Sequence, residues 1–101
     1  MTSRTDALKT AEGLINGDRN NQYGPPTQDF HRTAGLWTIY LDGKSTIEAY
    51  DVAAMMALLK ISRLTWKPEN EDSWIDLVGY AACGYECVME KVENQKAKKN
   101  V

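Results

Sequence analysis

The longest apolar segment of the chain lies at residues 46–64, TIEAYDVAAMMALLKISRL. At about 100° per residue, the apolar positions of 52–61 cover almost the whole circumference of a helix. A helix that is apolar on all sides is normally buried, and this one is too short to cross a bilayer, which takes about 20 apolar residues. We therefore predict a central helix that the other helices cover, with a second subunit covering whatever they leave open.

Three further segments show helical periodicity, at residues 3–16, 27–41 and 73–93. A nine-residue polar loop, DRNNQYGPP at 18–26, and a turn containing Pro68 separate them. The basic tail at 94–101 is expected to fray. The pattern predicts an all-α fold, a four-helix bundle formed by one domain at residues 1–101.

Composition narrows the class of protein. The 101 residues are 43% hydrophobic and 26% charged, which indicates a globular chain. A domain this small buries limited apolar surface, so a homodimer or higher oligomer is expected. The net charge of −2 argues against a nucleic-acid partner bound through bulk electrostatics. No segment indicates a membrane partner or a leader peptide, and we expect the protein in the cytoplasm of a host cell.

The two cysteines, Cys83 and Cys87, are four residues apart in a helical segment. Their side chains lean in the same direction along one helix face, which does not favour a disulfide. Two cysteines alone do not form a zinc site, so we interpret both as buried thiols. They share a helix stripe with Asp72, Asp76 and Tyr80. The apolar surface of this helix is expected from its other apolar residues, which are Trp74, Leu77, Val78, Ala81, Ala82, Tyr85, Val88, Met89 and Val92. The only histidine, His31, has no second His or Cys beside it and is expected at the surface or in an interface.

The polar loop at 18–26 is the first candidate for a ligand site. Arg19, Asn21 and Gln22, together with Asn20, offer hydrogen bonds to a polar ligand, and Tyr23 offers a ring for stacking. Trp37 is a second aromatic candidate for base or ligand binding. The alternative is a plain crossover in which Tyr23 covers the edge of the core.

Two pairs of carboxylates form the second candidate site. Glu48 with Asp51 and Asp72 with Asp76 each lie on one face of a helix. Four converging carboxylates would hold Mg²⁺, which activates water against a phosphoanhydride. Two cations, Lys60 and Arg63, would then bind phosphate oxygens.

These charges also have structural interpretations. Ser45-Thr46-Ile47-Glu48 is the pattern of a capping box at the start of the central helix, and Asp51 suits a helix N-terminus. If the last two helices form a hairpin around Pro68, Asp76 comes near Lys60, which lies about 13 Å along the axis from Asp51. Either a second chain then completes the metal site, or Asp72 and Asp76 form salt bridges with Lys60 and Arg63 across the hairpin.

Three sequence segments resemble a family of small domains of unknown function found largely in phages. They are DRNNQYGPP with the following F…A-x-L-W at 18–37, DVAAMMALLKISR at 51–63, and DSWIDLVGYAACGYE at 72–86. More distantly, the chain resembles the MazG-like all-α NTP pyrophosphohydrolases, which bind Mg²⁺ through E-E-x-x-E and E-x-x-D helices. The resemblance implies a MazG-like arrangement and Mg²⁺ as cofactor.

The same resemblance assigns roles to individual residues. Glu48 and Asp51 match the last two acids of the first motif, with Ile47 in place of its first Glu. Asp76 matches the last acid of the second motif, with Ser73 in place of its Glu. Catalytic roles for Asp76 and Glu48 are what this match implies.

Together, these observations predict a phage-type helical domain that binds or hydrolyses nucleotides. The alternative is a non-catalytic phage protein that binds a host or phage protein, for example an inhibitor of a host defence system. A structural oligomer without a ligand is a third interpretation.

Overall fold

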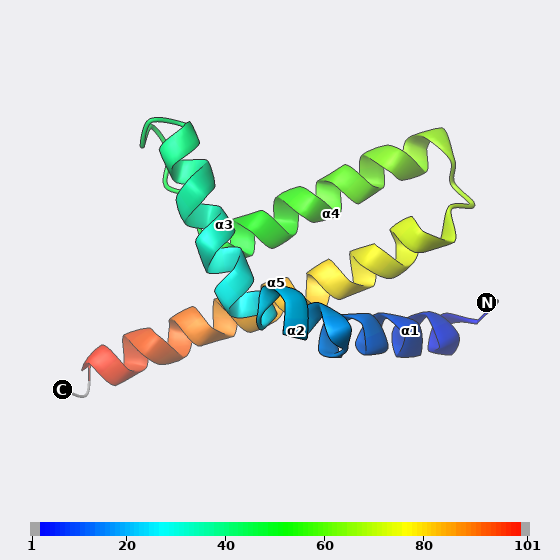
Figure 1. The fold of residues 1–101 in the computed structure, drawn as a ribbon, viewed down its shortest axis with the longest axis horizontal. Coiled ribbons are helices and arrows are strands. Elements are labelled where there is room, and N and C mark those ends of the chain that lie inside the picture. The colour runs from blue at the N-terminus through cyan, green and yellow to red at the C-terminus, as the bar shows by residue number, and fades with distance from the viewer. Residues whose placement is uncertain (1–2, 100–101) are drawn as a thin grey trace.

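The computed structural model describes residues 3–99, and within that range the chain forms helices and no strands (Figure 1). The all-α prediction is confirmed, with four long helices as predicted and one short helix in addition. The helices are α1 (Arg4–Asn16), α2 (Asp18–Tyr23), α3 (Pro26–Tyr40), α4 (Ala49–Trp66) and α5 (Glu71–Lys99).

Helices α4 and α5 form an antiparallel hairpin that is the scaffold of the molecule (Figure 1). The turn between them is fixed by the Trp74 indole N–H, which donates to the carbonyl of Pro68 at 2.8 Å. Helix α1 lies along the first half of α5, and α3 crosses the hairpin and projects away from it (Figure 1). The core where α3, α4 and α5 meet contains Phe30, Ala34, Ala49, Val52, Ala53, Cys83 and Cys87.

Apart from Ile75, the face of α5 that packs inward is made of small side chains. Its buried residues are Ser73, Ile75, Gly79, Cys83 and Cys87. Periodicity favours a different face with larger apolar residues, but Trp74 is 53% exposed and Tyr85 69% exposed. That prediction is wrong because small residues let α1 and α4 approach the α5 backbone closely, which leaves the large side chains at the flanks.

The start of α4 differs from the predicted capping box. The helix begins at Ala49, and Glu48 is its N-cap residue. The backbone N–H of Glu48 donates to the Asp51 carboxylate at 2.9 Å, so the reciprocal hydrogen bond of the cap comes from Asp51. At the start of α1, Ser3 is the N-cap residue, and its hydroxyl accepts a hydrogen bond from the N–H of Asp6 at 3.1 Å.

The polar loop predicted at residues 18–26 contains the short helix α2. The N–H of Gly24 donates to the carbonyl of Asn20 at 2.9 Å and closes this helix. Gly24 has φ +81°, a left-handed conformation that suits glycine. Two prolines follow, and Pro26 takes the first turn of α3, where its missing N–H leaves no hydrogen bond unmade.

The predicted frayed tail is helical for most of its length. Helix α5 continues to Lys99, so residues 94–99 extend the helix predicted to end at 93, whereas residues 100 and 101 lie outside the described range. Gln, Ala and Lys are good helix formers. Lys96, Lys98 and Lys99 also lie in the last turn, where cations interact favourably with the helix dipole.

The prediction that α4 is buried on all sides is wrong for one side of the helix. Val52 and Ala53 are each 2% exposed on the side that faces the core. On the opposite side Leu58 is 64% exposed, and Trp66 at the end of the helix is 92% exposed. Helices α3 and α5 together are too few to surround α4. None of the helices described here has the length and apolar character needed to span a membrane.

Candidate functional site

A cavity of about 230 Å³ lies where α1, α2, α3 and α5 meet. Six of its lining residues are charged or aromatic and come from three helices: Asp18, Arg19, Asp29, Phe30, Asp76 and Tyr80. The α1 side contributes Ala11, Gly13, Leu14 and Ile15. The short helix α2 therefore forms one wall of the cavity, at the place where the sequence indicated an irregular loop.

Arg19 is the basic group of the cavity wall. Burial lowers its pKa, but a side-chain hydrogen bond with Tyr80 and attraction to Tyr80 and Asp29 outweigh this effect and raise the pKa overall. The guanidinium is a permanent cation near neutral pH, as arginine side chains are in proteins. It also lies 6.0 Å from the centre of the Tyr23 ring, within the range of a cation–π contact.

Two aromatic rings form the floor of the cavity. Phe30 and Tyr80 stack with their ring centres 6.2 Å apart and their planes inclined at 29°. Phe30 is buried, and Tyr80 is half-buried with its hydroxyl near Arg19. A flat ligand entering the cavity would meet apolar and aromatic surface together with a few placed polar groups, as is typical of small-molecule sites.

Gly79 sets the distance between α1 and α5 beside the cavity. A Cβ atom at this position would lie 3.2 Å from Cγ2 of Ile15, closer than most packed methyl groups. Glycine inside a helix is costly, so its presence indicates close helix approach or room for a ligand. Gly79 is buried, lines the cavity, and has both properties.

The structure does not bring the four candidate metal ligands together. Glu48 accepts a hydrogen bond from Lys91 at 3.2 Å, and Asp51 caps the start of α4. Asp76 pairs with Lys60 at 2.9 Å, near the other end of the hairpin, and Asp72 is exposed in the first turn of α5. In residues 3–99, no group of three or more His, Cys, Asp or Glu side chains is arranged to hold a metal ion.

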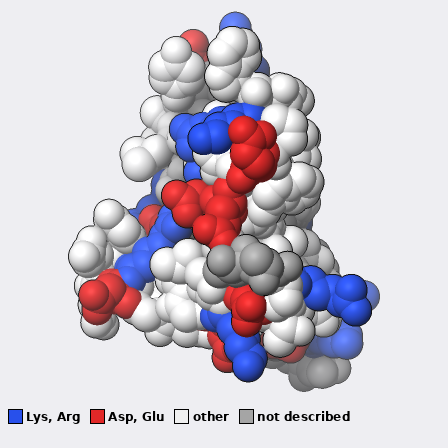
Figure 2. Space-filling model, turned by 90° about the vertical axis from the view of Figure 1, so that its right-hand side faces the viewer, with Lys and Arg blue, Asp and Glu red and all other residues white. Residues whose placement is uncertain are grey.

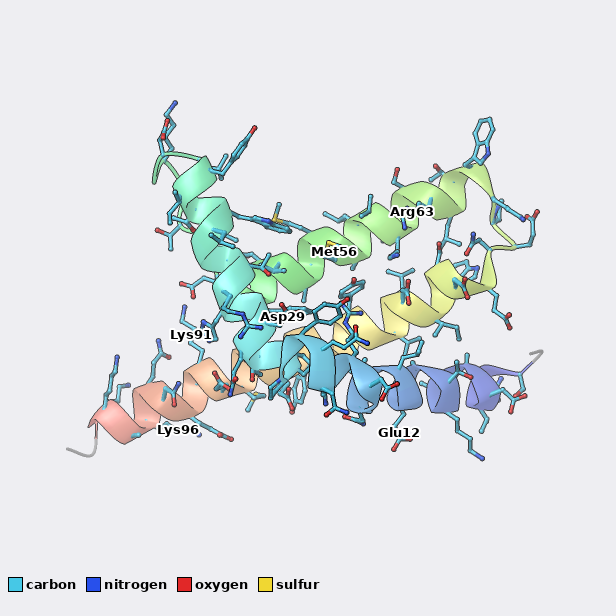
Figure 3. The ribbon with its side chains drawn as sticks, viewed as in Figure 1. Glu12, Asp29, Met56, Arg63, Lys91 and Lys96 are labelled. Carbon is cyan, nitrogen blue, oxygen red and sulfur yellow. The ribbon has the colours of Figure 1, made fainter. Side chains whose placement is uncertain are left out.

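The two candidate phosphate-binding residues lie in different settings. The Lys60 side chain is only 12% exposed and is engaged by Asp76. Arg63 is exposed on α4 toward the turn (Figure 3). On the end of the molecule that carries this turn, a group of acidic side chains lies beside a band of basic ones (Figure 2).

The candidate ligand residues of the polar segment also separate. Arg19 and Asn20 line the cavity, whereas Asn21 and Gln22 are exposed and lie outside its lining. Tyr23 is 52% exposed and contacts Arg19 from outside the cavity. Trp37 packs against the core instead.

Sequence reasoning missed Asp29, Phe30 and Tyr80 as cavity residues. Asp29 has a sufficient structural role at a helix N-terminus, and Phe30 fits a core stripe. Tyr80 shares a stripe with Asp76, which was the one available signal. Asp29 lies at the base of α3, where α2 and α3 meet (Figure 3). His31 is on the surface, as expected, 3.4 Å from Glu90.

The two thiols are buried, as predicted. The pKa of Cys87 is raised to about 11. Burial is the largest cause, followed by the neighbouring Cys83 and the carboxylates of Glu90 and Glu86. Burial and Glu86 also raise the pKa of Cys83, which Arg19 partly opposes. Both side chains are therefore neutral thiols near neutral pH.

We expect alkylation of Cys87 in the native chain to be about a hundredfold slower than in denaturant below pH 9, because the thiolate is the reactive form. Iodoacetamide labelling followed by mass spectrometry measures this. Equal labelling rates in native and denatured protein would contradict the burial of this thiol.

The free energy of unfolding should also fall as the pH rises from the ordinary thiol pKa of 9.0 to about 11, because only the unfolded chain loses the Cys87 proton in that range.

Comparison with known proteins identifies relatives of this sequence. The family described as a domain of unknown function (DUF6378) matches residues 6–88, a segment that contains every residue lining the cavity. The chain is 39% identical over 88 residues to the Gene 55 protein of Mycobacterium phage D29, and 40% identical over 86 residues to the Gene 55 protein of Mycobacterium phage L5.

These alignments cover 87% and 85% of this chain but only 57% and 51% of the two phage proteins, so the chain spans little more than half their length. No solved structure matches the chain. The match over residues 6–88 and the two phage relatives show that the chain belongs to the DUF6378 family.

Proposed function

We propose that this domain binds a nucleoside or nucleotide, with the base in the cavity between α1, α2, α3 and α5. The observation that carries the proposal is the combination of the stacked Phe30–Tyr80 floor with the charged groups of Arg19 and Asp29 on one cavity wall. A base has a flat apolar face and an edge of hydrogen-bond donors and acceptors. The aromatic floor would contact the face, and Arg19 and Asp29 would bond to the edge.

The volume of the cavity limits what it can enclose. About 230 Å³ is slightly below the range of about 300–1,000 Å³ that is usual for drug-sized ligands. A base fits within this volume, and the sugar and phosphate would extend to the mouth. The base edge would accept from the Arg19 guanidinium, while exocyclic amino groups would donate to Asp29.

Arg32 is the cation best placed to meet a phosphate at the mouth. Its guanidinium lies within 4 Å of the position of a Cβ atom on Gly24, which lines the cavity. It donates to the carbonyl of Tyr23 and lies 3.7 Å from the Asp29 carboxylate. The side chain is 58% exposed, so it is accessible to an anion from solvent. Lys60, by contrast, is held by Asp76.

Mg²⁺-dependent hydrolysis does not fit the carboxylates as they are arranged. Mg²⁺ requires near-octahedral oxygen coordination, and the candidate ligands Glu48, Asp51 and Asp76 are each engaged in a cap or an ion pair at separate places. We therefore propose binding and derive no hydrolytic step.

Titration calorimetry with nucleosides, mononucleotides and triphosphates tests the proposal. Asp29→Asn should weaken binding at least tenfold, a loss of about 1.4 kcal/mol, because it removes the charged acceptor for an amino group. Glu69→Gln, in the exposed turn after α4, makes the same change outside the cavity and should leave affinity unchanged. No binding of any of these ligands by the unmodified chain would contradict the proposal.

A parallel arm of the experiment measures pyrophosphate release with and without Mg²⁺. Binding without release supports a binding domain. Mg²⁺-dependent release by the unmodified chain would instead support the hydrolase interpretation and require a rearranged metal site.

The second candidate function is a non-catalytic role in binding a host or phage protein. The projecting end of α3 favours it, since Leu36 is 67% exposed, Ile39 73% and Tyr40 86%. Both relatives named above are phage proteins. Absence of nucleotide binding, with the fold intact, would make this function the better supported one.

A further inference from the structure

The outward side of α4 is an apolar surface that no other helix of residues 3–99 covers (Figure 1). We call it the α4 face. Its large members are Met55, Leu58, Leu59, Ile61 and Trp66, which are between 41% and 92% exposed. Ala54, Ser62 and Thr65 complete it and are exposed as well.

The spacing of the α4 face is that of a helix–helix seam. Met55, Leu58, Ser62 and Thr65 follow one another at intervals of three, four and three residues. This is the heptad spacing that lets two helices interlock side chains over several turns. Leu59 and Ile61 lie beside the seam and widen it.

The α4 face carries no charge between residues 54 and 66. The two cations of that segment, Lys60 and Arg63, lie off the seam, and Lys60 is held by Asp76 across the hairpin. When a surface meets its own copy across a twofold axis, every charge on it meets a like charge or must be offset. An uncharged apolar face has no such repulsion, so it is compatible with itself.

The core of one chain leaves apolar surface for a partner to cover. In the part of the chain described here, no large side chain is less than 2% exposed. A domain of about 100 residues is small enough that association adds substantially to its buried surface. A standard interface buries roughly 800 Å² per partner, and the five large apolar side chains of the α4 face, which are 41–92% exposed, supply apolar surface for the centre of such an interface.

We infer that the α4 face is the interface of a homodimer, in which a second copy of this chain packs its own α4 against it. The axis passes near the middle of the face, at Leu58 and Ser62. The interface lies on the far side of α4 from its contact with α5, so dimerisation leaves the cavity between α1, α2, α3 and α5 open. The inference does not depend on what the cavity binds.

Analytical ultracentrifugation of the full chain at micromolar concentration tests the inference. The unmodified protein should sediment at twice its chain mass of 11.4 kDa. Leu58→Glu places a charge at the axis and should weaken dimerisation at least a hundredfold, while circular dichroism shows the helices retained. Leu8→Glu is a matched control, because Leu8 on α1 is similarly exposed at 58%, and this variant should remain a dimer.

A cross-linking experiment keeps the test decisive if Leu58→Glu fails to fold. Ser62→Cys at the axis should be joined to its own copy by a short bismaleimide, whereas Ser45→Cys in the exposed segment before α4 should not. An unmodified chain that stays at 11.4 kDa overturns the inference. Dissociation by Leu8→Glu but not by Leu58→Glu overturns it too, as does cross-linking at Ser45 alone.

Discussion

Gly84→Val is expected to lower the free energy of unfolding by about 3 kcal/mol, the upper part of the range for overpacking a tight helix contact. A Cβ atom on Gly84 would already lie 3.0 Å from Cβ of Ala53. Ala53 is 2% exposed and belongs to the core of the hairpin, and its Cβ moves only with the helix backbone. Two further methyl groups would therefore push α4 and α5 apart.

Thermal melts at a fixed protein concentration measure this effect, because any association makes the melting temperature depend on concentration. For a domain of this size the melting temperature should fall by roughly 12–24 °C. Gly35→Ala is the control, since a Cβ at Gly35 meets nothing within 4 Å. That variant should gain up to about 1 kcal/mol from helix propensity alone.

The double variant Ala53→Gly with Gly84→Val separates a local contact from a general loss of helix stability. Removing the opposing methyl group should make the pair less destabilised than the sum of the two single variants. Additive losses would mean that Gly84 does not set the distance between α4 and α5.

The sequence predicted the helices better than it predicted their packing. Apolar periodicity placed four helices because each helix must bury a stripe, and this signal is local. Which stripe of α5 turns inward depends on two neighbours, α1 and α4, and on small residues such as Gly79 and Gly84. Side-chain hydrophobicity does not report that choice, so Trp74 and Tyr85 were assigned to the core and lie exposed.

In the candidate site, too, the sequence indicated local features but not which side chains the packing of the helices brings together. Arg19 was identified because it lies in a polar segment between helices, and it lines the cavity. Asp29 and Phe30 were not, because a helix N-terminus and a core stripe account for them equally well. The carboxylates Glu48 and Asp76 suggested a metal site by spacing, yet the length of the hairpin places them with Lys91 and Lys60 instead. Only the arrangement of the helices distinguishes a metal site from separate ion pairs.

Asp76→Asn is expected to lower the free energy of unfolding by about 2 kcal/mol, because it leaves the Lys60 ammonium without its partner. The Lys60 side chain is 12% exposed and that of Asp76 34%, with 2.9 Å between nitrogen and oxygen. Breaking a fully buried pair costs about 3–5 kcal/mol, and an exposed pair contributes about 0–1 kcal/mol. The intermediate burial of this pair places the expected loss between these ranges.

Asp72→Asn, one turn earlier on α5 and exposed, serves as the control and should change stability by less than about 0.5 kcal/mol. Adding Lys60→Met to Asp76→Asn should recover much of the loss, because the second change removes the unpaired cation and leaves an apolar side chain of similar length. A different outcome would contradict this prediction: Asp76→Asn has the melting temperature of the unmodified protein, while Mg²⁺-dependent pyrophosphate release collapses. Asp76 would then act on a metal, and the ion pair with Lys60 would not determine its role.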